Sequence, residues 1–161
     1  MIHIQHYASP CGTLVLASWR GTLCLCDWSE RKISKLEQAF GAKCAEVPTD
    51  VLRQAVSELD EYFAGSRTSF TVPLQPIGTD FQCQVWQALA SIPYGVTMSY
   101  TQIAQQIHRP QSVRAVAQAI GANPLSLFIP CHRVIGADGS LTGYAGGIAA
   151  KRLLLHTEGA L

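Results

Sequence analysis

Residues 99–121 read Ser-Tyr-Thr-Gln-Ile-Ala-Gln-Gln-Ile-His-Arg-Pro-Gln-Ser-Val-Arg-Ala-Val-Ala-Gln-Ala-Ile-Gly, and this stretch decides the fold of the second half of the chain. Ser99 is a good helix cap, and the helix that follows it ends at the His-Arg-Pro break of residues 108–110. A second helix begins near Ser112 and ends at Gly121. Two short helices joined by a tight connection predict a helix-turn-helix. Helical hairpins are also common in proteins that never bind DNA, so this pattern alone leaves DNA binding open.

Downstream of the two helices, Cys131, His132 and Arg133 set a thiol directly beside an imidazole and a guanidinium. A cysteine thiol has a pKa of about 8.5, and neighbouring positive charge can lower that value by several units. Cys131 is therefore a candidate nucleophile. A buried structural cysteine with two polar neighbours is an equally good interpretation of these three residues alone.

Upstream, the pattern predicts a small sheet with helices. Residues 2–7, 13–18 and 22–28 are short β-rich runs separated by turn residues, which predicts three antiparallel strands. A weaker helical pattern covers residues 32–40. A stronger one places Leu52, Val56, Leu59 and Phe63 on one apolar face, with Thr49 or Asp50 as the cap and Gly65 as the stop.

Residues 66–77 read as a strand that runs into a linker, because Pro73 and Pro76 lie in it. A further helix follows, marked by Phe81, Val85 and Leu89. The expected fold class is α/β (α+β), with a small antiparallel-sheet N-terminal lobe with helices and a mainly helical C-terminal lobe that contains the helix-turn-helix. We expect two domains, residues 1–77 and 78–161.

The chain has 161 residues and a formal net charge of +1, which argues weakly against a protein that binds polyanions. Residues 78–161 carry five basic and three acidic residues, so this half has a mild positive excess. No stretch approaches the roughly 20 apolar residues of a membrane span, and the N-terminus does not resemble a secretion signal. We expect a soluble, cytoplasmic protein with no membrane association.

Six cysteines occur in the chain, and the reducing cytosol favours thiols over disulfides. Cys24 and Cys26 would lie on one face of a strand, as a metal-binding pair could. No second pair at ligand spacing completes such a site, so packing explains them better and we expect no metal.

The segments around Cys131 resemble a known family. Residues 123–134 read Asn-Pro-Leu-Ser-Leu-Phe-Ile-Pro-Cys-His-Arg-Val, residues 141–147 Leu-Thr-Gly-Tyr-Ala-Gly-Gly and residues 153–159 Leu-Leu-Leu-His-Thr-Glu-Gly. This combination closely resembles the O6-alkylguanine-DNA alkyltransferases, strongly from residue 79 to 159 and more loosely before that.

The resemblance implies DNA repair by irreversible transfer of the alkyl group from O6-alkylguanine to Cys131. Such a protein is a methylated-DNA–protein-cysteine S-methyltransferase that acts once, a suicide enzyme without a cofactor. A soft thiolate suits attack on the alkyl carbon. The implied partner is double-stranded DNA that contains O6-alkylguanine, and the protein is expected to be a monomer. The implied roles of the domains are support for residues 1–77, and DNA binding and alkyl transfer for residues 78–161.

The resemblance also implies roles for the residues around the thiol. His132 would act as the base through a bridging water, and Glu158 would hold and polarise its imidazole. Tyr100 matches the donor that stabilises the departing guanine. Asn123 would tie the turn after the second helix to the segment of Cys131.

The DNA contacts and the substrate pocket are implied in the same way. Arg114 matches the arginine that fills the space left by a flipped nucleotide, and Ala115 and Ala117 would let the helix approach the minor groove. The substrate pocket would be lined by Val134, Tyr144, Ala145 and Gly146. Gln118 departs from the family pattern, because relatives more often place a small residue there. The zinc ligands of some relatives have no convincing match.

Two other classes of function compete with alkyl transfer. Alkyltransferase-like proteins bind alkylated guanine without accepting the group, but they lack the reactive cysteine that this chain has at Cys131. A cysteine hydrolase that uses Cys131 and His132 is the third interpretation, although adjacent residues rarely form such a dyad.

Overall fold

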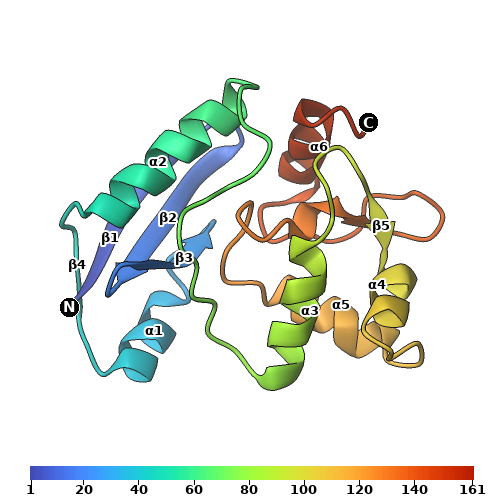
Figure 1. The fold of residues 1–161 in the computed structure, drawn as a ribbon, viewed down its shortest axis with the longest axis horizontal. Helices are drawn as coiled ribbons and strands as arrows, with labels where there is room; N and C mark the ends of the chain where they lie inside the picture. Colours follow the sequence, from blue (N-terminus) through green and yellow to red (C-terminus); the bar gives the residue numbers. More distant parts are fainter. The chain divides into compact units, whose positions relative to one another are not determined.

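The computed structural model describes all residues from Met1 to Leu161. The chain forms two compact units, Met1–Pro76 and Ile77–Leu161 (Figure 1). The first unit contains a sheet and two helices, and the second is mainly helical, in agreement with the predicted fold class.

The sheet of the first unit has the strand order β3-β2-β1-β4. The first three strands pair antiparallel, as predicted. The short β4 pairs parallel with β1, so the sheet is mixed, whereas the prediction had an antiparallel sheet of three strands. A strand of two residues carries too little pattern to be recognised in a sequence. The strands are β1 (Ile2–Ser9), β2 (Gly12–Trp19), β3 (Thr22–Asp27) and β4 (Cys44–Ala45).

Two helices complete this unit, α1 (Ile33–Phe40) and α2 (Asp50–Phe63). Thr49 caps α2 by accepting a hydrogen bond from the backbone N–H of Leu52, and α2 packs along β1, β2 and β3 (Figure 1). The predicted apolar face of α2 was partly wrong. Ala55 and Tyr62 are buried with Leu52 and Leu59, while Val56 and Phe63 are half-buried.

The strand predicted within residues 66–77 is also wrong. It shrinks to a single bridge, in which Leu23 on β3 donates to the carbonyl of Pro73 and accepts from the N–H of Gln75. Prolines have no N–H to extend a ladder, so Pro73 and Pro76 limit the pairing.

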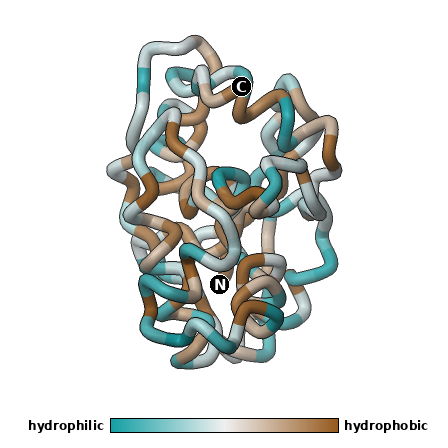
Figure 2. Tube along the Cα trace, turned by 90° about the vertical axis from the view of Figure 1, so that its right-hand side faces the viewer, coloured by the Kyte–Doolittle hydropathy of each residue, from teal (hydrophilic) through white to brown (hydrophobic).

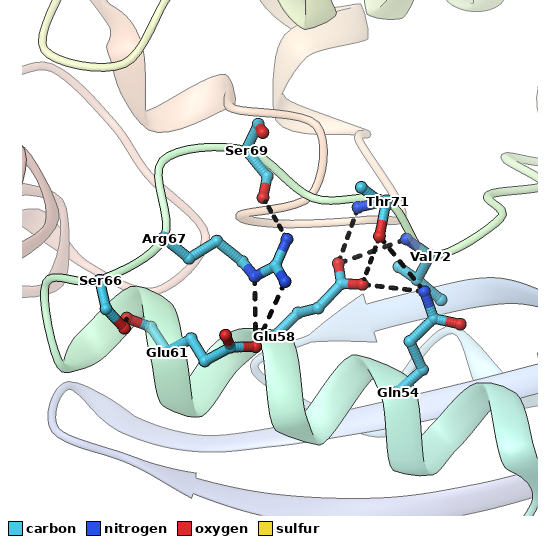
Figure 3. A network of polar contacts seen from close by, with 8 residues as sticks. All are labelled: Gln54, Glu58, Glu61, Ser66, Arg67, Ser69, Thr71 and Val72. Carbon is cyan, nitrogen blue, oxygen red and sulfur yellow. Dashed lines mark hydrogen bonds and ion pairs between the residues drawn. The ribbon is translucent and has the colours of Figure 1, made fainter.

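A buried carboxylate fastens this segment to α2 (Figure 3). Glu58, 3% exposed, accepts hydrogen bonds from the backbone N–H groups of Thr71 and Val72, the hydroxyl of Thr71 and the amide of Gln54. Burial by itself would raise the pKa of Glu58, but the hydrogen bonds from Gln54, Thr71 and Val72 outweigh it, and the pKa lies below its ordinary value of 4.5. The ionised form of Glu58 therefore stabilises the fold.

In the second unit, α4 and α5 form the predicted helix-turn-helix. Ser99 and Gln102 make a reciprocal capping box at the start of α4, and Thr79 and Gln82 make another at α3. Trp86 on α3 donates its indole N–H to the carbonyl of Ala119 on α5 at 2.8 Å. The elements are α3 (Asp80–Ala90), β5 (Met98–Ser99), α4 (Tyr100–Gln106), α5 (Val113–Gly121), the 3₁₀ helix η1 (Cys131–Arg133), β6 (Val134–Ile135) and α6 (Ile148–Thr157).

Hydrophobic and hydrophilic residues alternate over short stretches of the chain (Figure 2). None of the helices combines the length and the apolar character that crossing a membrane would require.

The substitution Glu58→Gln tests the buried carboxylate. Hydrogen bonds to charged groups contribute about 1.5–3 kcal/mol, so we expect the free energy of unfolding in urea at pH 7 to fall by about that amount. Because the folded pKa of Glu58 lies below the unfolded value, its contribution is present above pH 4.5 and is lost as the pH falls through the folded pKa. The variant should lose this part of the acid dependence.

Glu61→Gln is the matched control on the same helix. Glu61 accepts from Arg67 at 3.3 Å, but its side chain is 45% exposed, and exposed ion pairs contribute about 0–1 kcal/mol. Equal destabilisation by the two substitutions would contradict the role assigned to Glu58.

Candidate active site

Cys131 follows a buried segment that side-chain hydrogen bonds hold in place. Asn123 accepts from the N–H of Leu125 at 3.0 Å and donates to the carbonyl of Ile129 at 2.9 Å. Within this segment Leu127 has a φ of 70°, which is uncommon for leucine and is maintained where the surroundings fix it. The thiol therefore begins η1 at the end of a constrained turn, and Cys131 is 7% exposed.

His132 and Glu158 lie in direct contact. The imidazole Nε2 is 2.7 Å from Oε2 of Glu158, and both side chains are fully buried. Burial lowers the pKa of His132; the carboxylate of Glu158 opposes this shift, while Arg133 and Lys151 add to it, and the net direction is downward. The other ring nitrogen, Nδ1, makes no hydrogen bond within the chain.

Arg133 binds the same carboxylate. Its Nε donates to Oε1 of Glu158 at 2.7 Å and its Nη2 to Oε2 at 3.1 Å, which is a bidentate pair. Nη1 donates to the carbonyl of Ile92 at 2.7 Å, and the guanidinium lies over the ring of Tyr94. Glu158 also accepts from the N–H of Gly95 at 3.4 Å. The carboxylate is thus held on several sides.

Lys151 is a second buried cation of the site. Its side chain comes from α6, and its ammonium donates to the carbonyl of Thr142 at 3.0 Å. Burial lowers the pKa of Lys151, and the attraction between its ammonium and the sulfur of Cys131 partly opposes this. The ammonium therefore favours negative charge on that sulfur.

A small pocket of about 50 Å³, partly open to solvent, has Cys131 in its wall. The hydroxyl of Tyr100 lies 2.9 Å from that of Thr142 beside this pocket. Val134 and Gly146, both predicted to line the pocket, do not line it, and Val134 is buried in β6. The lining residues are Tyr100, Ala117, Ile120, Gly121, Asn123, Ser126, Cys131, Gly143, Tyr144 and Ala145.

Helix α5 presents a polar outer face and an apolar inner one. Val116, Ala119 and Ile120 are buried, whereas Arg114 and Ala115 are exposed in the first turns. Ala117 is half-buried at the pocket, and Gln118 lies exposed one turn after Arg114. The predicted DNA-contacting residues are therefore divided between the exposed surface and the pocket wall.

Sequence reasoning missed three residues of this site. Arg133 was interpreted as a charge beside the thiol, and nothing in its position along the chain indicates that it reaches Glu158, 25 residues away. Lys151 lies on α6 in a run that reads as an ordinary amphipathic pattern. Thr142 precedes the glycine-rich loop. For Lys151, its place among apolar residues of a helix was the available signal.

Chemically, the site combines a thiol at a pocket wall, a buried imidazole whose pKa is lowered and a buried carboxylate that contacts the imidazole. A thiol beside such a base can lose its proton and attack an electrophilic carbon in the pocket. Cys131, His132 and Glu158 resemble a nucleophile, a base and the group that orients the base. In the predicted mechanism a bridging water connects the imidazole to the thiol.

Comparisons with known proteins agree with this chemistry. A family model described as "6-O-methylguanine DNA methyltransferase, ribonuclease-like domain" matches residues 2–76, and one described as "6-O-methylguanine DNA methyltransferase, DNA binding domain" matches residues 80–160. Among curated relatives, methylated-DNA–protein-cysteine methyltransferases from Mycobacterium tuberculosis and Methanosarcina barkeri are 46% and 43% identical. The first alignment covers 98% of this chain and 93% of the relative, and the second covers 93% and 92%.

Solved structures agree over the full length. The fold is similar to that of Mycobacterium tuberculosis OGT in complex with DNA, with a TM-score of 0.86 and 43% identity over 98% of this chain and 93% of that chain. An O6-methylguanine DNA methyltransferase from Methanococcus jannaschii is also similar, with a TM-score of 0.67 and 25% identity over 96% and 93% of the two chains.

Proposed function

The chain belongs to the 6-O-methylguanine DNA methyltransferase family, and on that premise we propose that it repairs DNA by transferring the alkyl group of O6-alkylguanine irreversibly to Cys131. The observation that carries the proposal is the position of Cys131 in the wall of a pocket, next to a buried histidine whose Nε2 contacts Glu158. A relative 43% identical to this chain is described in complex with DNA, which supports damaged DNA as the partner.

The first step prepares the nucleophile. His132 takes the proton of the Cys131 thiol at Nδ1, through a bridging water, because Nε2 is engaged by Glu158. Lys151 stabilises the negative charge that remains on the sulfur. Asn123 keeps the segment that carries the thiol in a fixed conformation.

The transfer step is a displacement at the alkyl carbon. A sulfur electron pair forms the S–C bond while the C–O6 bond breaks and its electrons pass to the guanine. Tyr100, which lines the pocket, exchanges its contact with Thr142 for the guanine and donates its hydroxyl proton there. The proton that His132 took from the thiol leaves to solvent and Tyr100 regains one from solvent, so overall guanine gains one proton, the thiol loses one, and the reaction balances without a cofactor.

The product explains why each molecule acts once. A thioether on Cys131 has no ready route of hydrolysis, so the protein is consumed. The reaction is stoichiometric transfer, in contrast to the turnover of a cysteine hydrolase.

The helix-turn-helix formed by α4 and α5 binds the DNA. The target atom lies inside the base stack, so the nucleotide must be flipped out at a cost of a few kcal/mol. We assign Arg114 to the vacated space, because it is exposed in the first turn of α5. Ala115 is small enough for close approach to the minor groove, and Ala117 lies where α5 meets the pocket.

The pocket receives the flipped guanine. Tyr144 and Ala145 form part of its wall. Gly146 and Val134 do not line it in this conformation, so we assign them to shaping the loop and the strand behind the wall.

The two domains have different roles in this proposal. Residues 78–161 carry DNA binding and alkyl transfer, and residues 1–77 act as a support domain. We propose that the protein works as a monomer on double-stranded DNA in the cytoplasm, where the reactive thiol stays reduced.

Incubation with duplex DNA that contains O6-methylguanine tests the transfer. We expect the peptide of Cys131 to gain one methyl group in place of a hydrogen, at one equivalent per protein, as measured by mass spectrometry. Cys131→Ala should abolish the adduct and retain binding of the lesion, because the thiol contributes to chemistry more than to docking. Cys83→Ala is the matched control, since Cys83 lies outside the pocket, and it should leave the adduct unchanged.

Binding without any loss of the methyl group would instead indicate a lesion-binding protein. Repeated turnover of an ester or amide substrate would indicate a hydrolase. Either result would contradict the proposed function.

Arg114→Ala tests base flipping. We expect the transfer rate at saturating duplex DNA to fall by about fivefold to 150-fold, because the flipped state loses an interaction of about 1–3 kcal/mol. Transfer from free O6-benzylguanine, which needs no flipping, should change much less. The measurement is single-turnover kinetics on both substrates.

Arg109→Ala removes another exposed positive charge of the same unit and is the control for charge alone. It should leave the rate at saturating DNA unchanged. An equal loss for Arg114→Ala on duplex DNA and on the free base would rule out the flipping role.

A further inference from the structure

The carboxylate of Glu158 has two close side-chain partners, His132 and Arg133, and the reaction steps proposed above involve only His132. Arg133 contacts both carboxylate oxygens, at 2.7 and 3.1 Å, while His132 contacts Oε2 at 2.7 Å. Arginine remains protonated in proteins, so it holds Glu158 in the ionised form, which can only accept hydrogen bonds. The hydrogen between His132 and Glu158 must therefore come from Nε2 of the imidazole.

The charges of the site decide whether His132 carries one proton or two. Glu158 and Arg133 neutralise each other, and the buried ammonium of Lys151 faces the same region. A second proton on His132 would add positive charge to a buried site that has no carboxylate left to balance it. The imidazole is therefore kept neutral, with its hydrogen on Nε2 and its lone pair on Nδ1.

The surroundings of Arg133 show that its side chain is built into the fold. Its Nη1 is bound by the carbonyl of Ile92, and its guanidinium stacks over Tyr94. The hydroxyl of Tyr94 in turn donates to the carbonyl of Thr157, next to Glu158. Arg133 is 6% exposed. This planar, buried arrangement suits a guanidinium, and a lysine ammonium cannot reproduce it.

We propose that Arg133 is a positioning residue for the proton chemistry of the site: it balances the charge of Glu158, so that His132 stays neutral and presents an unprotonated Nδ1 to the thiol of Cys131. Arg133 acts through Glu158 and His132 and does not touch the substrate. This inference rests on the proposed function, because it assigns His132 as the base.

Loss of the guanidinium has a specific consequence. In Arg133→Met, Glu158 would keep its negative charge with His132 as its nearest partner. Without the guanidinium, the negative charge of Glu158 acts mainly on its hydrogen-bonded neighbour His132 and favours a second proton there, which raises the pKa of the imidazole and blocks Nδ1 near pH 7. The variant should regain activity as the pH rises, since deprotonation restores the base. A residue that only supports the fold would lower the rate equally at every pH.

The experiment is the pH profile of single-turnover transfer to Cys131 from saturating duplex DNA with O6-methylguanine, between pH 6 and 9. For Arg133→Met we expect the apparent pKa of the acid limb to rise by about one unit or more, within the range that a neighbouring charge produces. Its rate should be several-fold below that of the wild type at pH 7 and close to it at pH 9. Arg133→Lys keeps the charge without the bidentate contact and should shift less.

Arg152→Met is the matched control, because it removes an exposed arginine from α6. Its profile should coincide with that of the wild type. If Arg133→Met folds poorly, the profile of Arg133→Lys decides the question, with thermal melting as the check on folding. A profile lowered in parallel at all pH values, or an unshifted one, would overturn the inference. Absence of methyl transfer by the wild type itself would instead overturn the proposed function.

Discussion

The buried carboxylate of Glu158 is the constraint on which the rest of the site depends. It joins His132 and Arg133, two buried side chains that are adjacent in the chain, through direct contacts with both. Breaking a buried pair by removing one partner typically costs about 3–5 kcal/mol, because it leaves a charge without a counter-ion. In our proposal, the same interaction that stabilises the fold around η1 and the end of α6 also sets the protonation of His132. The contacts of Glu158 with His132 and Arg133 therefore matter both for the stability of the fold and for the proposed chemistry.

The elements around this carboxylate hold its three partners, His132, Arg133 and the N–H of Gly95, in position. Residues 92–95 contribute a carbonyl and an N–H, and α6 contributes Glu158 at its end. The turn from Asn123 to Cys131 is closed by the hydrogen bonds of the asparagine side chain, which places the thiol at the start of η1. Helices α3 and α5 are fixed to each other by the indole of Trp86. The pocket thus has walls from rigid elements, as a site for one directed displacement requires.

Much of this fold can be predicted from the sequence, because local signals determine it. The capping residues Thr49 and Ser99 and the helix-turn-helix are confirmed, and the first three strands follow from β-rich runs between turns. The failures arise where tertiary packing decides. The buried face of α2 includes Ala55 and Tyr62, since the fit of the helix on the sheet overrides a simple apolar spacing. The two-residue β4 pairs with residues of β1 that lie 42 positions earlier in the chain.

The candidate site divides in the same manner. Cys131 and His132 are adjacent in the chain, so their proximity is visible in the sequence, and the partnership of His132 with Glu158 came from a family resemblance. The contact between Arg133 and Glu158 spans 25 residues, and the burial of Lys151 depends on how α6 packs. Charges that lie far apart in a sequence reveal their partners only when the chain is folded. This is why the proton balance of the site could not be predicted.

The protonation state of His132 is the most direct test of the proposed balance of charge between His132, Glu158 and Arg133. Nitrogen-15 NMR of the histidine-labelled protein, with the signals of His132 assigned by comparison with a His132→Gln variant, reports which ring nitrogen carries a hydrogen. At pH 7 we expect a neutral ring with the hydrogen on Nε2 and none on Nδ1. A ring protonated at both nitrogens, or a neutral ring with its hydrogen on Nδ1, would contradict it.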